Sequence, residues 1–134
     1  MEIREYGEYK EDEILRLYAS VGWTAYTDDP SALRRGFENP LLILGAYEGG
    51  ELIGLIRAVG DGATIVFIQD ILVLPEHQRR GVGTALVKAA VGRFRGVRQI
   101  ELVTDDTEKT VRFYKSAGFR ELSELGCRGF MRIG

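Results

Sequence analysis

A segment rich in glycine and arginine, between a predicted strand and a predicted helix, is the part of this sequence best suited to chemistry. It reads Gln78-Arg79-Arg80-Gly81-Val82-Gly83-Thr84, follows an apolar stretch at 65–74 that ends at Pro75, and runs into a helical pattern at 84–94. A helix start offers unpaired main-chain N–H groups and a partial positive charge, and both favour anions. Glycine lets a ligand approach the main chain closely, and arginine adds charge-assisted donors. We interpret this segment as a cradle for a pyrophosphate group.

The spacing of the segment separates it from two common phosphate-binding motifs. It has neither the Lys and Ser or Thr that follow the last glycine of a phosphate loop nor the pattern G-x-G-x-x-G. Instead, Gln78-x-x-Gly81-x-Gly83 after a strand ending in proline resembles the acetyl-CoA signature of the GCN5-related N-acetyltransferases (GNAT). A second segment, Phe113-Tyr114-Lys115-Ser116-Ala117-Gly118-Phe119, is similar to the C-terminal tyrosine motif of that family. The resemblance spans residues 9–119.

Periodicity and turn signals predict the elements that must position these motifs. Helices are expected at 11–21, 29–38, 84–94 (with an apolar stripe that begins at Val82) and 107–117, and strands at 3–6, 41–48, 51–59, 63–74, 99–103, 119–122 and 127–133. Gly49-Gly50 and Asp61-Gly62 are hairpin turn signals. A meander followed by alternating strands and helices implies an α/β (α+β) fold with a partly parallel sheet. The resemblance implies the same architecture: a centrally splayed sheet, antiparallel in its N-terminal half and parallel in its C-terminal half, whose wedge admits a pantetheine arm.

Length and composition limit the class of protein. The 134 residues suffice for a single domain, expected at 1–134, and the net charge of −2 gives no general attraction to nucleic acid. We find no apolar run long enough for a membrane span and no signal-peptide segment, so we expect a cytoplasmic protein that binds neither membrane nor nucleic acid. The single cysteine, Cys127, excludes an internal disulfide, and no cluster has metal-ligand spacing.

Asp70 is a candidate proton acceptor within an apolar strand. Alternation places its side chain on the face of Val66, Ile68 and Leu72, and burial there would raise its pKa. In the resembled family an acidic residue on this strand often acts as the base, directly or through water. The alternative is that Asp70 pairs with Arg57 across the hairpin. Gln69 is expected on the opposite face, where it satisfies main-chain groups.

Tyr114 is a candidate general acid. Its helical spacing from Val111 and Ala117 would also suit a core aromatic. The resemblance implies the catalytic role, because the matching tyrosine of the family points its hydroxyl at the sulfur of coenzyme A and protonates the leaving thiolate. A phenol is a suitable weak acid for that step.

The residues expected to bind acetyl-CoA follow from the same motifs. Main-chain N–H groups of Arg79, Gly81, Gly83 and Thr84, with the side chain of Arg79 or Arg80, would hold the phosphates within the motif Gln78–Thr84. The resemblance implies that the main chain of Leu72 and Val73 pairs with the pantetheine amides. The family often has Asn seven residues before the motif tyrosine; here Thr107 takes that position, with Asp105 and Asp106 close by.

Substrate-side residues are aromatic and acidic. Trp23, Tyr26 and Phe37 would overhang an acceptor pocket, and their alternative role is core packing. A cationic amine would be favoured by a set of carboxylates, namely Asp28, Asp29, Asp61 and Asp70. The only histidine, His77, is interpreted as a surface residue rather than a base.

Together these features predict an acetyl-CoA-dependent N-acetyltransferase that acts on a primary amine of a small molecule. The amine would attack the thioester directly, because no Ser or Cys is a credible nucleophile for an acyl-enzyme. Two alternatives stay open: a non-catalytic sensor domain that binds coenzyme A, and an acetyltransferase acting on protein N-termini or lysines. No metal is expected, and the predicted C-terminal strands could support a homodimer.

Overall fold

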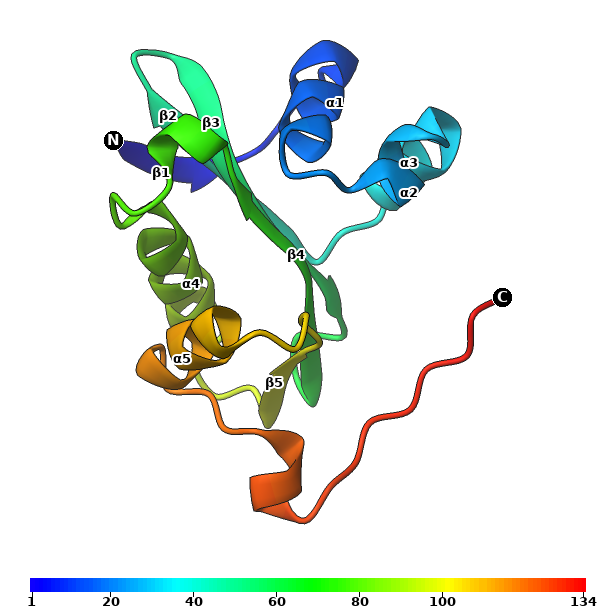
Figure 1. Cartoon of the computed structure of the whole chain (residues 1–134), viewed down its shortest axis with the longest axis vertical. Helices are drawn as coiled ribbons and strands as arrows, with labels where there is room; N and C mark the ends of the chain where they lie inside the picture. The colour runs from blue at the N-terminus through cyan, green and yellow to red at the C-terminus, as the bar shows by residue number, and fades with distance from the viewer. The chain divides into compact units, whose positions relative to one another are not determined.

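The first compact unit of the protein is a five-stranded sheet with helices on both faces. The computed structural model describes residues 1–134, which divide into the units 1–103 and 104–134. The strands lie in the order β1 (Glu2–Glu5), β2 (Leu42–Glu48), β3 (Glu51–Gly60), β4 (Ile65–Val73) and β5 (Gln99–Leu102) (Figure 1). Neighbours from β1 to β4 are antiparallel, and β4 and β5 are parallel. The predicted mixed sheet is therefore confirmed.

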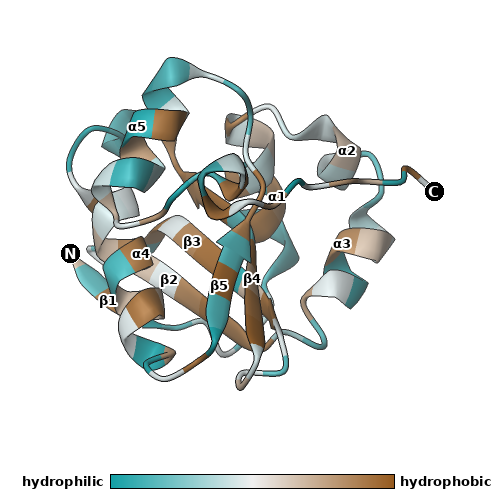
Figure 2. Cartoon of the chain, turned by 90° about the horizontal axis from the view of Figure 1, so that it is seen from below, coloured by the Kyte–Doolittle hydropathy of each residue, from teal (hydrophilic) through white to brown (hydrophobic).

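Helices cover the two faces of this sheet where the apolar pattern places them. They are α1 (Glu11–Ser20), α2 (Thr24–Thr27), α3 (Pro30–Gly36) and α4 (Val82–Arg93), with a short 3₁₀ turn, η1 (Pro75–His77). The predicted stripe of α4 is buried against one face at Val82, Leu86, Val87 and Ala90. The side chains of α1 that are buried against the other face recur at helical spacing. Figure 2 shows the apolar β2, β3 and β4 that lie between these layers.

Turn chemistry sets the register of the antiparallel part. Gly49 and Gly50 both have positive φ angles, 59° and 83°, as the predicted two-residue hairpin requires. The next turn is closed by Asp61, whose carboxylate accepts hydrogen bonds from the main-chain N–H groups of Ala63, Thr64 and Ile65. Asp61, one of the carboxylates expected to favour an amine, therefore has a turn-forming role.

The strands β4 and β5 pair over only part of their length. Their register runs from Ile65–Gln99 to Ile68–Leu102, where β5 ends. Residues 69–73 of β4 continue with β3 on one side and no strand on the other. The sheet therefore opens at the end of β4, which is the splay that the resemblance implies.

A β-bulge in β4 overturns the predicted placement of Gln69 and Asp70. Arg57 pairs with Asp70, but the next residue of β3, Ala58, pairs with Ile68, which leaves Gln69 as the extra residue. A bulge breaks the alternation of the strand. Asp70 therefore faces away from Val66 and Ile68, so that part of the expectation is wrong, whereas Asp70 and Leu72 share a face as expected. Gln69 turns its amide to Tyr26 instead of satisfying main-chain groups.

The second unit consists of one helix, one 3₁₀ turn and an extended C-terminal segment. Helix α5 (Glu108–Ser116) starts after Thr107, whose hydroxyl caps it by accepting from the N–H of Thr110 at 3.3 Å. The turn η2 (Leu122–Leu125) is closed by a capping box between Glu121 and Glu124. The strands predicted at 119–122 and 127–133 are not present. The capping box holds the first segment in a turn, and the second has no strand beside it. None of the helices in either unit is both long and apolar enough to cross a membrane.

The turn after β3 yields a test of backbone conformation. Gly60 has a φ of +137°, and a Cβ added there would meet the main-chain carbonyl of Ile65. We expect Gly60→Ala to destabilise the protein by about 1–3 kcal/mol. The matched control is Gly92→Ala in α4, where a Cβ meets no neighbouring atom; it should stabilise by about 0.5–1 kcal/mol. Urea unfolding followed by circular dichroism measures both, and equal stability of the two variants would contradict the expectation.

Candidate functional site

The junction between β4 and α4 presents a row of main-chain donors without partners. No main-chain N–H from Arg79 to Thr84 donates a hydrogen bond, and the first helical bond runs from Ala85 N to Gly81 O at 3.0 Å. Arg79, Gly81 and Thr84 are exposed, so these donors lie at the surface. The start of α4 adds the partial positive charge of a helix N-terminus. This arrangement suits a multiply charged anion.

The backbone of the junction has the form of an anion-binding concavity. Arg79 has a φ of 64° and is the only non-glycine residue with a positive φ, and Gly81 follows with 81°. Changes between right- and left-handed conformations turn successive N–H groups toward one point. A left-handed arginine is strained, and such strain concentrates at functional sites. A Cβ at Gly81 would meet nothing within the protein, so glycine is needed there for conformation rather than for space.

The start of this loop is tied to the end of β4. The side-chain amide of Gln78 donates to the carbonyl of Val73 at 3.1 Å, so Gln78 shapes the loop. Leu74 N donates to Ile53 O of β3 at 2.8 Å. Because main-chain groups alternate in direction along a strand, Leu72 also faces β3, while Val73 faces the open side of β4. The geometry therefore favours Val73 over Leu72 as a main-chain partner for a ligand.

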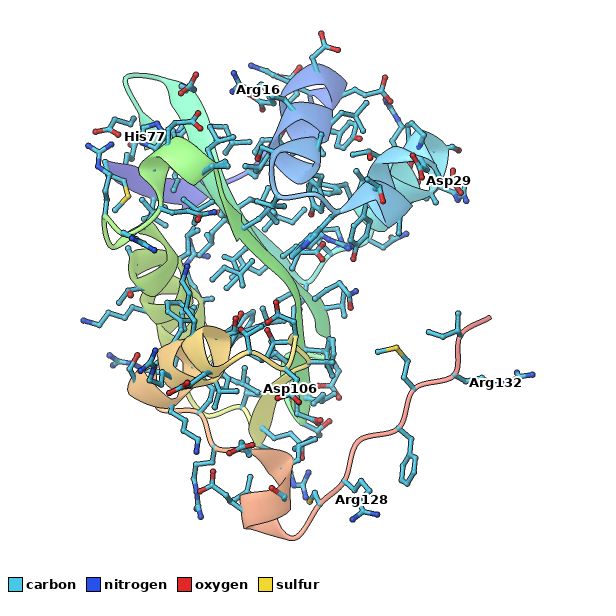
Figure 3. All side chains as sticks on the ribbon, viewed as in Figure 1. Arg16, Asp29, His77, Asp106, Arg128 and Arg132 are labelled. Carbon is cyan, nitrogen blue, oxygen red and sulfur yellow. The ribbon has the colours of Figure 1, made fainter.

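The two arginines of the loop have different surroundings. Arg80 lies 3.2 Å from His77 Nδ1 and 3.8 Å from the Glu48 carboxylate, and His77 lies 3.2 Å from Glu48. Arg79 makes no ion pair. His77 also lies 4.0 Å from Glu51, so His77 and Arg80 tie the loop to the β2–β3 hairpin. Glu51 pairs in addition with Arg16 of α1 at 3.5 Å (Arg16 and His77 are labelled in Figure 3). The side chain of His77 is 15% exposed, so it lies half-buried at the surface, where it contacts the carboxylates of the hairpin.

A buried polar network surrounds Asp70 on the opposite face from α4. Asp70 Oδ2 accepts from the Tyr18 hydroxyl at 2.9 Å and from Arg57 at 2.7–2.8 Å, and Oδ1 accepts from the Tyr26 hydroxyl at 2.8 Å. Arg57 also donates to the carbonyl of Gly36 at 3.1 Å. Asp70 is 2% exposed and Arg57 6%. The pairing of Asp70 with Arg57 across the hairpin, the alternative left open by the sequence, is therefore present.

The two tyrosines of this network keep their protons, and Arg57 keeps its charge. Burial and the charge of Asp70 raise the pKa of Tyr18 far above its usual range. Burial also raises the pKa of Tyr26, although the hydrogen bond from Gln69 lowers it in part. Burial alone would lower the pKa of Arg57, but the adjacent Asp70 carboxylate raises it overall. Both phenols are thus neutral donors, and both oxygens of Asp70 are engaged.

Some of the residues expected to bind the acceptor lie together around Asp70, and others have a core or capping role. Tyr26, Gln69 and Asp70 come together, since the Gln69 amide donates to the Tyr26 hydroxyl at 3.1 Å. Trp23 lies against Tyr26 with ring centroids 6.1 Å apart. Phe37 is buried, in the core role that was its alternative, and Asp29 caps α3. The hydrogen bond from Tyr18 to Asp70 could not be predicted from the residues near Tyr18, because its spacing on α1 indicates only a core residue.

Tyr114 belongs to the second unit and has an aromatic environment of its own. Its ring packs edge-to-face on Phe113 and Phe119, with centroids 5.0 and 5.9 Å away. Burial, with a smaller effect of the Asp105 charge, raises the pKa of Tyr114 to about 12. The phenol therefore holds its proton at neutral pH. The hydroxyl of Thr107, expected to reach a ligand, is engaged as the cap of α5.

A mixed sheet that opens beside a free helix start defines the class of acyl-CoA N-acyltransferase folds. The chain belongs to the acetyltransferase (GNAT) family, whose sequence profile matches residues 8–119. A solved GNAT-family acetyltransferase from Streptococcus pneumoniae is 41% identical, with a TM-score of 0.89 over 99% of this chain and 97% of that chain.

Two further relatives are more distant. Thialysine N-epsilon-acetyltransferase of Mus musculus is 37% identical over 62 residues, which are 44% of this chain and 36% of that protein. An aminoglycoside 6'-N-acetyltransferase solved with coenzyme A is 20% identical, with a TM-score of 0.72 over 88% of this chain and 84% of that chain; this likeness concerns the fold alone. The chain spans less than half the length of the curated relatives it matches.

The Asp70 network yields a stability prediction. Asp70→Ala would leave Arg57 buried without its partner, so we expect a loss of about 3–5 kcal/mol in the free energy of unfolding. Arg16→Ala, which breaks a pair with Glu51 that is about half exposed on both sides, should change stability by less than about 1 kcal/mol. Guanidinium unfolding measures both. An Asp70→Ala variant as stable as the wild type would mean that the carboxylate does not hold this network together.

Proposed function

We propose that this protein is an acetyl-CoA-dependent N-acetyltransferase that transfers an acetyl group to a primary amine of a small molecule. The observation that carries the proposal is the row of unpartnered main-chain donors from Arg79 to Thr84 at the open end of β4. Membership of the GNAT family supports the reaction class. The names of two relatives, an aminoglycoside 6'-N-acetyltransferase and a thialysine N-epsilon-acetyltransferase, support an amine acceptor.

The residues of the junction fit the diphosphate and the pantetheine arm of coenzyme A. Main-chain N–H groups of residues 79–84 would bind the phosphate oxygens, and Arg79, which has no other ion pair, would add a charged donor. The main-chain N–H of Val73 faces the open side of β4, where it would pair with a pantetheine amide as a neighbouring strand does. Acetyl-CoA supplies the thioester, whose acyl carbon the amine attacks directly.

The acceptor amine would be positioned by Tyr26, Gln69 and Trp23. Asp70 accepts from Tyr26 and so holds its ring in place. Because both carboxylate oxygens of Asp70 already accept hydrogen bonds, we assign Asp70 a positioning role. The base that removes the proton from the amine would be an ordered water held by Tyr26 and Gln69. Holding both reactants in one orientation would contribute much of the rate enhancement.

Tyr114 would donate the proton to the leaving thiolate. Its raised pKa keeps the phenol protonated at neutral pH, which is the form that a general acid requires. The direct attack of the amine on the thioester requires no acyl-enzyme.

Variants of the phosphate cradle test the proposal. Gly81→Glu and Gly83→Glu should abolish binding of coenzyme A, because a carboxylate would occupy the anion site and repel the phosphates. The matched control is Gly92→Glu on the same helix, which should bind like the wild type. Isothermal titration calorimetry measures all three. Wild-type affinity in both cradle variants would refute the phosphate role of this loop.

The leaving-group role of Tyr114 has a separate test. Tyr114→Phe should lower kcat by about 10²-fold or more and leave the Kd for coenzyme A nearly unchanged, because only the proton donor is lost. Tyr9→Phe removes a phenol hydroxyl elsewhere and is the control. The assay is thiol release from acetyl-CoA over panels of small amines, peptide N-termini and lysine peptides. An unchanged rate in Tyr114→Phe would leave this residue a packing role only. Tight binding of coenzyme A without turnover of any acceptor would favour a sensor, and turnover of peptides alone would contradict the small-molecule acceptor.

A further inference from the structure

His77 lies between the phosphate cradle, residues 79–84, and the β2–β3 hairpin, and it contacts charged groups of both signs. Its Nδ1 is 3.2 Å from Oε2 of Glu48 and 3.2 Å from Nη1 of Arg80, and its Nε2 is 4.0 Å from Oε1 of Glu51. The main-chain N–H of His77 donates to the carbonyl of Leu74 at 2.9 Å. The half-buried ring, labelled in Figure 3, is therefore held in place beside the hairpin.

The Nδ1 atom of His77 cannot satisfy Glu48 and Arg80 at the same time. A neutral ring with its hydrogen on Nε2, toward Glu51, accepts a hydrogen bond from Arg80 through Nδ1. A protonated ring carries hydrogen on both nitrogens and can only donate, which suits Glu48. The guanidinium is always charged and has no acceptor, so its hydrogen bond to His77 exists only while the ring is neutral. Each protonation state of the ring therefore favours a different neighbour.

The charges around the ring are balanced only while the ring is neutral. They are two carboxylates and two guanidinium groups: Glu48 and Glu51 of the hairpin, Arg80 of the loop, and Arg16 of α1 behind Glu51, whereas Glu76 of the same 3₁₀ turn is in no ion pair. A proton on His77 adds a positive charge that repels Arg80. It also competes for Glu48, whose other oxygen lies 3.8 Å from the guanidinium. Because the side chain of Arg80 is half exposed, Arg80 is the group that protonation would release.

We propose that His77 is a positioning residue for the phosphate site: the neutral ring holds Arg80 against the hairpin, and protonation frees Arg80 for an anion at the cradle. The inference rests on the proposed function of the cradle. Arg80 lies between Arg79 and Gly81, the two residues of the loop with positive φ angles, so its side chain starts within the site. The ligand class is a nucleotide diphosphate, whose negative charge both the released guanidinium and the imidazolium would favour.

The direction of the pH effect follows from the coupling between the proton and the ligand. Because the ligand would bind more tightly to the protonated protein, its affinity rises as the pH falls. By the same coupling, binding of the ligand takes up protons. Histidine is the side chain that ordinarily changes charge between about pH 5 and pH 8, and His77 is the only histidine of the chain. A variant without His77 therefore removes this effect completely.

Calorimetric titration of the full chain with dephospho-coenzyme A between about pH 5 and pH 8 tests the proposal. This probe keeps the diphosphate but lacks the phosphate monoester of coenzyme A, which itself titrates at about pH 6. We expect the wild type to bind about three- to tenfold more tightly at the acid end, the effect of one partly screened charge, and to take up protons on binding. His77→Gln, whose amide oxygen can still accept from Arg80, should keep the weaker affinity at every pH. His77→Lys, which is permanently charged, should keep the tighter affinity.

A second pair of variants identifies the group that protonation releases. Arg80→Gln should lose the pH dependence of binding, whereas Arg95→Gln, at an exposed arginine outside the cradle, should retain it. The same pH dependence in the wild type and in His77→Gln would overturn the proposal. So would a pH dependence that persists in Arg80→Gln, because another group would then respond to the proton.

A measurement without ligand separates this inference from the proposed function. The ¹⁵N resonance of the Arg80 side chain in the free protein should shift between about pH 5 and pH 8 in the wild type and stay constant in His77→Gln. A constant resonance in both proteins would contradict the release of Arg80, whatever the ligand does. If the resonance shifts but the probe binds at no pH, the phosphate cradle is refuted, and with it the role of Arg80 toward an anion.

Discussion

The main chain at the end of β4 is the constraint on which the rest of this structure depends. Beyond Ile68, β4 has a strand on one side only, and α4 begins after Gly81 with its first N–H groups unbonded. Unsatisfied polar groups are tolerated when water or a ligand can reach them. The open sheet, the left-handed Arg79 and Gly81, and the exposed loop all leave these donors unpaired, as the anion site that we propose requires. Much of the fold serves to hold that junction in place.

The buried pair between Arg57 and Asp70 gathers the residues that we propose to position the acceptor amine. It lies at the bulge where β3 and β4 change register, and it draws Tyr18 of α1 and Tyr26 of α2 to one carboxylate. Buried ion pairs give little net stability but impose one arrangement on their surroundings, a role we assign to this pair. On the other side of the loop, His77 and Arg80 bind the β2–β3 hairpin through Glu48. The loop is thus held at the end of β4 and at the hairpin.

Local patterns in the sequence predicted most of the elements, and non-local contacts account for the errors. The parallel pairing of β4 and β5 follows from the order of strand, helix and strand along the chain. The helix at 107–117 and the Gly49-Gly50 hairpin depend on spacing and turn residues within one segment. The bulge at Gln69 does not, because an extra residue in β4 is defined only by its register with β3. The hydrogen bond of Tyr18 to Asp70 and the contacts of His77 with the β2–β3 hairpin join distant parts of the chain in the same way. The strand predicted at 127–133 has the right alternation, but a strand also needs a partner edge.

The most direct test of the central claim is amide chemical-shift mapping of the ¹⁵N-labelled protein during titration with coenzyme A. We predict saturable shifts that are largest at the main-chain amides of residues 79–84 and at Val73, since these donors would gain hydrogen bonds to the ligand. No shifts at any soluble concentration of coenzyme A, or shifts confined to other parts of the protein, would contradict the assignment of this junction as the phosphate cradle.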